Sequence, residues 1–128
     1  NKKYSNILDE LDIFFNERIK SCIDQGIDKE KIIIDPGIGF GKSGDDNVKI
    51  LENIDVLKSI HTNICIGSSN KRFSSKLFNG IETKDDLNIA NLATFAVSSL
   101  RGTEYLRVHD VGLTKDTVLI IDKAKAHM

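Results

Sequence analysis

Asp35 begins a glycine-rich segment, "DPGIGFGK" at residues 35–42, which has the composition of a binding loop. Three isoleucines precede the aspartate, so Asp35 is expected to end a buried strand, and Pro36 holds it extended. The spacing excludes the two common nucleotide loops. A P-loop requires a glycine where this chain has Pro36, and the glycines at 37, 39 and 41 are one residue short of the dinucleotide pattern. What remains is a carboxylate at a strand end beside a flexible loop, where α/β folds place binding chemistry.

Arg107 and His109 bring cationic chemistry to another expected strand, at residues 105–109. Because side chains alternate along a strand, both should lie on one face. A guanidinium can bind two phosphate oxygens at once, and an imidazole can donate to the same anion. A lone strand histidine is more often a satisfied structural residue. With Arg107 two positions earlier and Asp110 beside it, however, an anion site is favoured.

A third polar cluster, "GSSNKRF" at residues 67–73, follows the expected strand 64–67. Ser68 or Ser69 can cap a helix, whose first N–H groups are able to bind a carboxylate or a phosphate. Each of these residues also has an ordinary structural alternative. The serines can serve as caps only, Lys71 can be a solvated surface residue, and Asp35 can be an acidic turn residue.

The elements that must position these side chains alternate between short apolar strands and amphipathic helices. We expect strands over 31–35, 64–67 and 105–109, and helices over 5–25, 46–60, from Ser68 or Ser69 to 78, over 86–101 and, capped by Thr114, over 114–126. Such alternation predicts a helix-covered parallel sheet, with the three polar segments at one rim. A complete (β/α)8 TIM barrel needs about 250 residues. The fold class is therefore α/β, with residues 1–128 as the carboxyl-terminal part of such a barrel, with about three parallel strands.

The composition limits the classes of partner that the protein is expected to bind. With 18 basic and 19 acidic residues the net charge is -1, which argues against nucleic acid and anionic membranes as partners. No apolar run of about 18 residues predicts a membrane span, and no secretory leader is expected. Cys22 and Cys65 have no zinc-type spacing and are expected to be reduced, buried thiols of a cytoplasmic protein. His61 and His127 fit no motif and are expected at the surface.

Taken together, the three rim segments resemble dihydropteroate synthase, a family of folate-pathway enzymes. "DPGIGFGK" resembles the family's loop after its sixth strand, and Asn47 stands where a nearby asparagine often follows. "GSSNKRF" is similar to the segment after the seventh strand, and "RVHDV" at 107–111 to the eighth-strand signature. Order and spacing agree over nearly all of this chain, which corresponds to about half of a family member.

The resemblance implies that 6-hydroxymethyl-7,8-dihydropterin pyrophosphate and para-aminobenzoate condense to 7,8-dihydropteroate and pyrophosphate. Mg²⁺ would accompany the substrate pyrophosphate, with no ligand assignable in this chain. Asp35 would hydrogen-bond the pterin and stabilise positive charge in its ring. The resemblance implies Asp35, Lys71, Arg107 and His109 as catalytic residues, and Asp35, Phe40, Gly41, Ser68, Ser69, Lys71, Arg72, Arg107 and His109 as substrate-binding residues.

In the family, Lys71 corresponds to a lysine that donates to the pterin, and Arg107 with His109 would serve the ring and its diphosphate. Ser68 and Ser69 lie where the family receives the para-aminobenzoate carboxylate, and Phe40 would pack near that ring. Asn70 is a departure, because the family commonly has arginine there; Arg72 restores some of the positive charge. The segment "LNIANLATF", at 87–95, also departs from the family's usual pattern.

Two alternatives stay open beside the synthase. One is a pterin-binding half-barrel module without turnover, and the other is a barrel like that of pterin-dependent methyltransferases. A three-stranded sheet would expose both of its edges. The chain is therefore expected to be a fragment of a longer polypeptide, or to associate with a second chain or further copies of itself.

Overall fold

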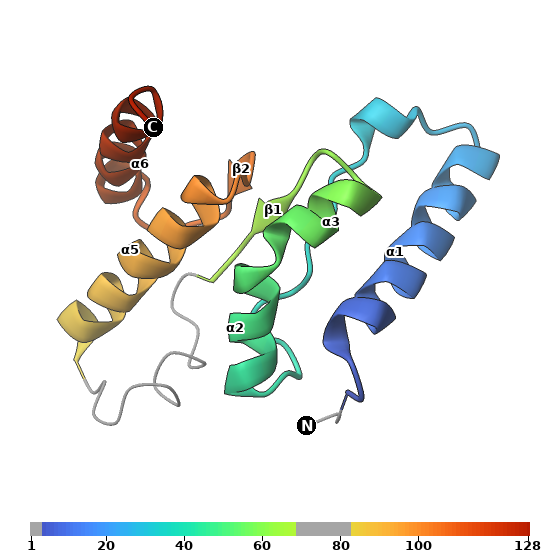
Figure 1. Ribbon diagram of the computed structural model, residues 1–128, viewed down its shortest axis with the longest axis horizontal. Helices are drawn as coiled ribbons and strands as arrows, with labels where there is room; N and C mark the ends of the chain where they lie inside the picture. Colours follow the sequence, from blue (N-terminus) through green and yellow to red (C-terminus); the bar gives the residue numbers. More distant parts are fainter. Residues whose placement is uncertain (1–3, 69–82) are drawn as a thin grey trace.

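The computed structural model describes residues 4–68 and 83–128, which form a helix-covered parallel sheet (Figure 1). The elements in chain order are α1 (Ile7–Asp24), a short 3₁₀ helix (Lys29–Lys31), α2 (Gly44–Glu52), α3 (Ile54–Ile60), β1 (Cys65–Ile66), α5 (Lys84–Leu100), β2 (Tyr105–Leu106) and α6 (Val111–Lys125). β1 and β2 are parallel, with Cys65 opposite Tyr105. Ile34 joins them through an isolated parallel bridge to Ile64. Three parallel segments thus lie side by side, as expected.

The three segments are shorter than the sequence pattern predicts. The expected strand 31–35 is reduced to the bridge at Ile34, and Lys31 belongs to the 3₁₀ helix. The other two expected strands are reduced to the two residues each of β1 and β2. The Ile34 N–H donates to the Asn63 carbonyl, and its carbonyl accepts from Cys65, so its bonds run to one neighbour. The extent of a strand depends on its backbone pairing with neighbours, which apolar runs alone do not reveal.

α1 follows its sequence pattern closely. Four apolar residues at intervals of four are buried: Ile7, Leu11, Phe15 and Ile19. Asn6 caps the helix, accepting a hydrogen bond from the Leu8 N–H at 3.2 Å, and Gly26 follows its end with φ of 90°. The prediction of a helix over 5–25 is confirmed.

The helix expected over 46–60 is in fact two helices, α2 and α3, separated at Asn53. Asn53 has φ −121° and ψ 38°, and its side-chain amide donates to the Lys49 carbonyl at 2.8 Å. Asparagine side chains that bond to the nearby backbone compete with helix continuation. α2 also begins earlier than expected, at Gly44, because Ser43 caps the helix and forms a reciprocal capping box with Asp46.

The caps of the last two helices also differ from expectation. α5 begins two residues early, since Thr83 and Asp86 form a second capping box. α6 is capped by Asp110, whose carboxylate accepts from the Leu113 N–H at 2.9 Å. Thr114, the expected cap, lies inside the helix and donates to the Asp110 carbonyl at 2.7 Å. The helix expected from Ser68 or Ser69 to 78 falls mostly outside the described residues.

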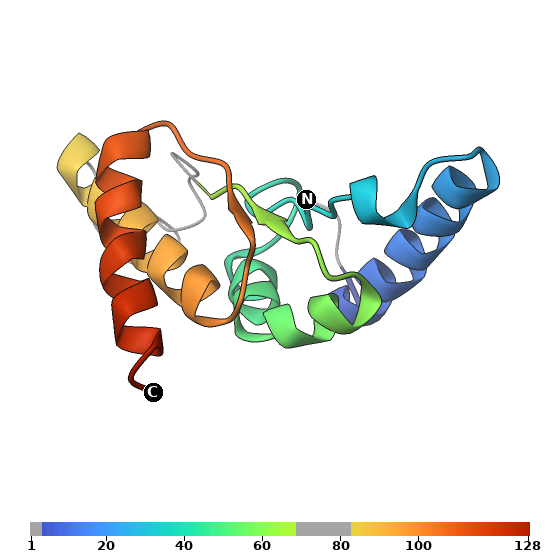
Figure 2. The same cartoon turned by 90° about the horizontal axis from the view of Figure 1, so that it is seen from above.

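One apolar core joins the sheet to the first three helices. Its buried members are Ile7, Leu11, Phe15, Ile19, Ile34, Ile38, Ile50, Leu51, Ile54, Leu57, Ile64 and Ile66. Seen from above, the helices form an arc on one side of the strands (Figure 2). The residues that alternate with the buried ones point to the other face, where Ile33 is 47% and Tyr105 46% exposed. We call this the inner face.

The burial of three side chains differs from what the sequence suggests. His61 is 3% exposed rather than at the surface, because it ends α3 beside the sheet, where its Nε2 lies 2.5 Å from the Ile32 carbonyl oxygen. Cys22 and Cys65 are free but only half-buried. His127 is exposed, as expected. In the described residues, no helix has the length and apolarity needed to cross a membrane.

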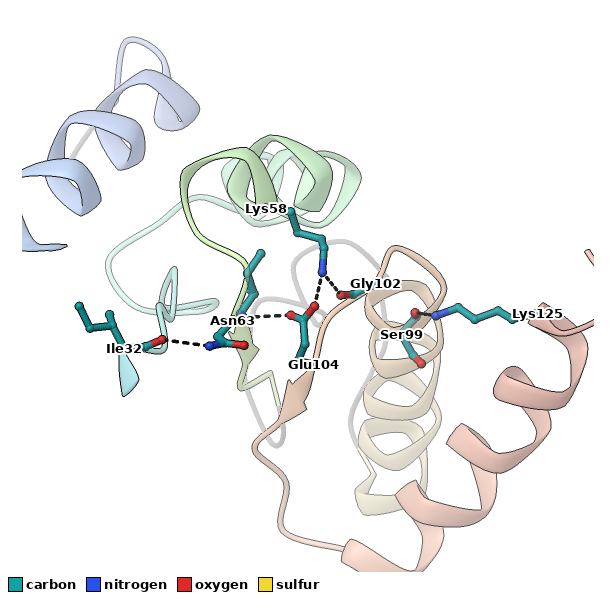
Figure 3. Close-up of polar contacts among 8 residues, drawn as sticks. Ile32, Lys58, Asn63, Ser99, Gly102, Glu104 and Lys125 are labelled. Carbon is teal, nitrogen blue, oxygen red and sulfur yellow. Dashed lines mark hydrogen bonds and ion pairs between the residues drawn. The ribbon is translucent and has the colours of Figure 1, made fainter. Parts of the chain in front are cut away.

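A polar network ties the starts of β1 and β2 together (Figure 3). The Lys58 ammonium donates to the Gly102 carbonyl at 2.8 Å and pairs with Glu104. The second carboxylate oxygen of Glu104 accepts from the Ile64 N–H at 3.1 Å. Burial alone would raise the pKa of Glu104, but the hydrogen bonds from Lys58 and Ile64, with the charge of Lys58, lower it overall.

Glu104→Gln should therefore weaken folding most at neutral pH. Because the folded pKa of Glu104 is lowered, its contribution is present above the unfolded value of about 4.3 and is lost as pH falls through the folded pKa. The pair is a third exposed, so we expect a loss of about 1 kcal/mol or less. Urea unfolding at pH 7 and at pH 3 should show a smaller pH dependence in the variant. Glu17→Gln, at an exposed position of α1, is the control, and an equal flattening there would contradict the assignment.

Candidate functional site

Asp35 and Arg107 meet at the carboxyl ends of two different strand segments. An Arg107 guanidinium nitrogen (Nη2) lies 3.2 Å from Asp35 Oδ2, although the residues are 72 positions apart. The other carboxylate oxygen accepts from the Gly37 N–H at 2.8 Å. The side chains are 33% and 57% exposed respectively, so both remain accessible to a ligand. The two charges expected at one rim are thus in contact.

Gly67, the residue after β1, leaves the space that Arg107 occupies. A Cβ added at Gly67 would lie 2.4 Å from the nearest guanidinium nitrogen and 2.7 Å from the guanidinium carbon. Gly67 is buried, and the guanidinium lies directly over its backbone. Sequence reasoning did not assign a role to this residue. The available signal was a glycine at a strand end, which often marks the close approach of another group.

The glycine loop between Asp35 and α2 is fixed from within. Gly37, Gly39 and Gly41 have φ of 70°, 81° and 62°, a region that other residues rarely adopt. Lys42 donates from its ammonium to the carbonyls of Gly37 at 3.0 Å and Phe40 at 3.1 Å. The loop therefore has a defined shape, and its tip presents Phe40 with 59% of its surface exposed.

Asn47 holds the same loop from α2. It is 0% exposed, its Oδ1 accepts from the Gly39 N–H at 2.8 Å, and its Nδ2 donates to the Ser43 carbonyl at 2.7 Å. The asparagine noted in the sequence as part of the loop motif is therefore a support for the loop backbone.

Asn47→Ala should destabilise the protein by about 2 kcal/mol, because the Gly39 N–H loses its acceptor and a buried side chain leaves a void. Urea unfolding measures this change. Asn16→Ala is the control, since Asn16 is exposed on α1 and its amide donates to nearby Asp12. It should change stability by no more than about 0.5 kcal/mol. Equal losses in the two variants would contradict the role of Asn47.

Ser68, the residue after Gly67, is buried. It is 1% exposed, and its hydroxyl has no hydrogen-bond partner within residues 4–68 and 83–128. Ser69, Asn70, Lys71 and Arg72 lie outside the described residues, so their roles stay predictions.

His109 and Asp35 line two different cavities. His109 is exposed and lines a cavity of about 430 Å³ between α5 and α6, together with Asn91 and Phe95. Asp35 and Lys42 line another cavity, of about 350 Å³, between α1 and the glycine loop. β2 ends at Leu106, so Arg107 and His109 do not belong to a regular strand as expected, and their placement on one face stays a prediction.

The surroundings of Asp35 also alter the protonation of two neighbours. Burial lowers the pKa of Lys42, although the charges of Asp35 and Asp46 oppose this. Burial, followed by the charge of Asp35, raises the pKa of the Cys65 thiol, with Arg107 acting in the opposite direction. Cys65 therefore stays protonated at neutral pH. In the described segments, no group of three histidine, cysteine or acidic residues is arranged to hold a metal ion.

The arrangement is suited to a flat polar ligand with an anionic tail. The Asp35 carboxylate can accept from ring N–H groups, and the Arg107 guanidinium can stack on a ring or bind phosphate oxygens. Since the two side chains now pair with each other, a ligand must compete with that contact. The Arg107 side chain is long and more than half exposed, and Asp35 keeps its bond from the Gly37 N–H, so a ligand can replace Arg107 at Asp35.

Comparisons with known proteins agree with this chemistry. The family described as "Pterin binding enzyme" matches residues 1–109. Dihydropteroate synthase of Escherichia coli (strain K12) is 30% identical over 120 residues, which cover 94% of this chain and 42% of that relative. The chain thus spans less than half the length of this curated relative.

Two solved structures resemble the chain closely. The structure of Yersinia pestis dihydropteroate synthase with a sulfonamide drug complex has a TM-score of 0.92 and 26% identity, covering 100% of this chain and 46% of that one. Dihydropteroate synthase from Xanthomonas albilineans in complex with 7,8-dihydropteroate has a TM-score of 0.90 and 35% identity, covering 97% and 48%. The expected fold, part of a (β/α)8 barrel, is confirmed.

Proposed function

Because the chain belongs to the pterin-binding enzyme family, we propose that it supplies the carboxyl-terminal part of a dihydropteroate synthase active site. The reaction would join 6-hydroxymethyl-7,8-dihydropterin pyrophosphate to para-aminobenzoate, giving 7,8-dihydropteroate and releasing pyrophosphate. The observation that carries this proposal is the contact of Asp35 with Arg107 across two strand ends.

The chemistry assigns different tasks to the two charges. As pyrophosphate leaves, positive charge develops on the pterin methylene and spreads into the ring, and the Asp35 carboxylate stabilises it electrostatically. Arg107 leaves Asp35, stacks on the ring and binds the departing diphosphate, which Mg²⁺ accompanies as part of the substrate. The amine nitrogen then attacks the methylene carbon and loses a proton to solvent.

The remaining predicted site residues complete the proposal. Lys71 would donate to the pterin, and His109 would donate to the diphosphate. Ser68, Ser69 and Arg72 would receive the para-aminobenzoate carboxylate, while Phe40 and Gly41 would border its ring. The unsatisfied hydroxyl of buried Ser68 supports a ligand contact at this point.

The active form, in this proposal, contains further strands supplied by the same polypeptide or by a second one; we call it the complete barrel. Exposed Ile33 and Tyr105 on the inner face support this, since barrel interiors are filled by side chains from all strands. Homo-oligomers and a cytoplasmic location are part of the same proposal. The free thiols of Cys22 and Cys65 agree with a reducing compartment.

The decisive assay supplies the complete barrel with dihydropterin pyrophosphate, para-aminobenzoate and Mg²⁺, and measures 7,8-dihydropteroate. Parallel reactions omit each component in turn, and one contains residues 1–128 alone. Product that depends on both substrates supports the synthase. Pterin binding without product would instead identify a binding module, and transfer of a methyl group from a methylated pterin would identify a methyltransferase.

A further inference from the structure

We infer that Lys42 is a positioning residue for the amine substrate: its ammonium holds the tip of the glycine loop and so fixes where Phe40 stands. This inference rests on the proposed function. Lys42 is not expected to touch either substrate, and it acts through the backbone of residues 37–40.

The ammonium closes a small ring of backbone. The Phe40 N–H donates to the Gly37 carbonyl at 3.1 Å, which defines a turn over residues 37–40. The Lys42 ammonium bonds to the carbonyl at each end of that turn, Gly37 at 3.0 Å and Phe40 at 3.1 Å. A charged donor makes a stronger hydrogen bond than a neutral one, so it holds both carbonyls better than water would.

The Lys42 side chain occupies the space beside Gly37. A Cβ added at Gly37 would stand 3.3 Å from the Lys42 ammonium and 3.9 Å from two carbons of Phe40. The ammonium and the phenyl ring therefore both pack against the surface of Gly37. The partial burial that lowers the pKa of Lys42 agrees with a cation held inside the loop rather than extended into solvent.

Loss of the Lys42 ammonium should change the tip of the glycine loop and leave its base unchanged. At the base, Asp35 is held by the Gly37 N–H and by Arg107, and Asn47 holds Gly39 from the side of α2. At the tip, the Lys42 ammonium donates to the Phe40 carbonyl at 3.1 Å. Loss of the ammonium should therefore displace Phe40, which borders the amine, and leave Asp35, which serves the pterin, in place.

The test uses Lys42→Met in the complete barrel, which keeps most of the side-chain volume and removes the donor. We expect the KM for para-aminobenzoate to rise about tenfold, with kcat within about threefold and the pterin dissociation constant unchanged by calorimetry. Lys42→Arg should recover most of the KM, because a guanidinium can also donate to two carbonyls. Lys49→Met, which removes an exposed lysine from α2, is the matched control.

A second measurement does not need turnover. Hydrogen exchange in the peptide that contains residues 37–42 should become faster in Lys42→Met and stay unchanged in Lys49→Met. Unchanged exchange, or a KM for the amine equal to that of the unmodified protein, overturns the inference. If the unmodified protein makes no dihydropteroate, the proposed function fails, and the exchange result alone decides whether Lys42 holds the loop.

Discussion

Gly67→Ala is expected to abolish tight pterin binding while leaving the protein folded. The added Cβ would lie 2.4 Å from the Arg107 guanidinium, so that group must leave the position over Gly67 from which it contacts Asp35. The atom displaced is the far end of a flexible side chain, and Gly67 has no left-handed backbone that alanine would strain. Folding therefore changes little. Losing a charge-assisted contact to the ligand should cost about 2.7 kcal/mol of binding free energy, which raises the dissociation constant about 100-fold.

Both measurements use the complete barrel. Calorimetry with a dihydropterin ligand measures the affinity, and urea unfolding measures the stability. Gly112→Ala is the matched control, since within the described residues the nearest side-chain atom to its Cβ would be an Asp110 oxygen at 3.8 Å, an ordinary contact. It should bind the pterin like the unmodified protein. Normal affinity in Gly67→Ala would show that the position of Arg107 over Gly67 is not needed for binding.

Asp35→Asn should lower kcat by about 10²–10³-fold, because the carboxylate no longer stabilises the cation that forms on the pterin. The amide oxygen can still accept from the Gly37 N–H, so the loop keeps its base. The variant also loses the ion pair that holds Arg107. Stopped-flow or steady-state measurement of dihydropteroate formation checks the rate, and circular dichroism checks the fold.

Asp45→Asn is the control for charge. Asp45 is exposed in the first turn of α2, and its substitution changes the net charge equally. Its kcat should stay within about twofold of the unmodified protein, since surface substitutions away from special features have small effects. A kcat for Asp35→Asn within tenfold of normal would remove Asp35 from the chemistry and favour a purely structural role in the turn.

The meeting of Asp35 and Arg107 was predictable because strand ends in a parallel sheet share one rim. Each residue follows a short apolar run, and the alternation of strands and helices orders those runs in parallel. α1 was predictable for a similar reason, since its apolar residues recur at helical intervals. These features depend on local periodicity and on a general rule of chain connection, both visible in one sequence.

What escaped prediction depends on contacts between distant or flexible groups. The approach of Arg107 to Gly67 joins residues that follow two different strands, and the glycine at the strand end signals a close approach without naming the group that makes it. His61 was expected at the surface, yet its partner is the carbonyl of Ile32, 29 positions earlier. Lys42 lies within the quoted motif, but the turn that brings two carbonyls to its ammonium depends on three glycines in left-handed conformations.

The Lys58–Glu104 network and the Asp35–Arg107 pair lie at opposite ends of the same short strands. Substitution of Arg107 therefore leaves the contacts that join the strand starts in place. Substitution of Asn47, which supports the glycine loop from α2, does not share this independence, because it also removes a buried contact. Variants with altered ligand preference should accordingly keep the thermal tolerance of their parent where the change spares the support of the loop.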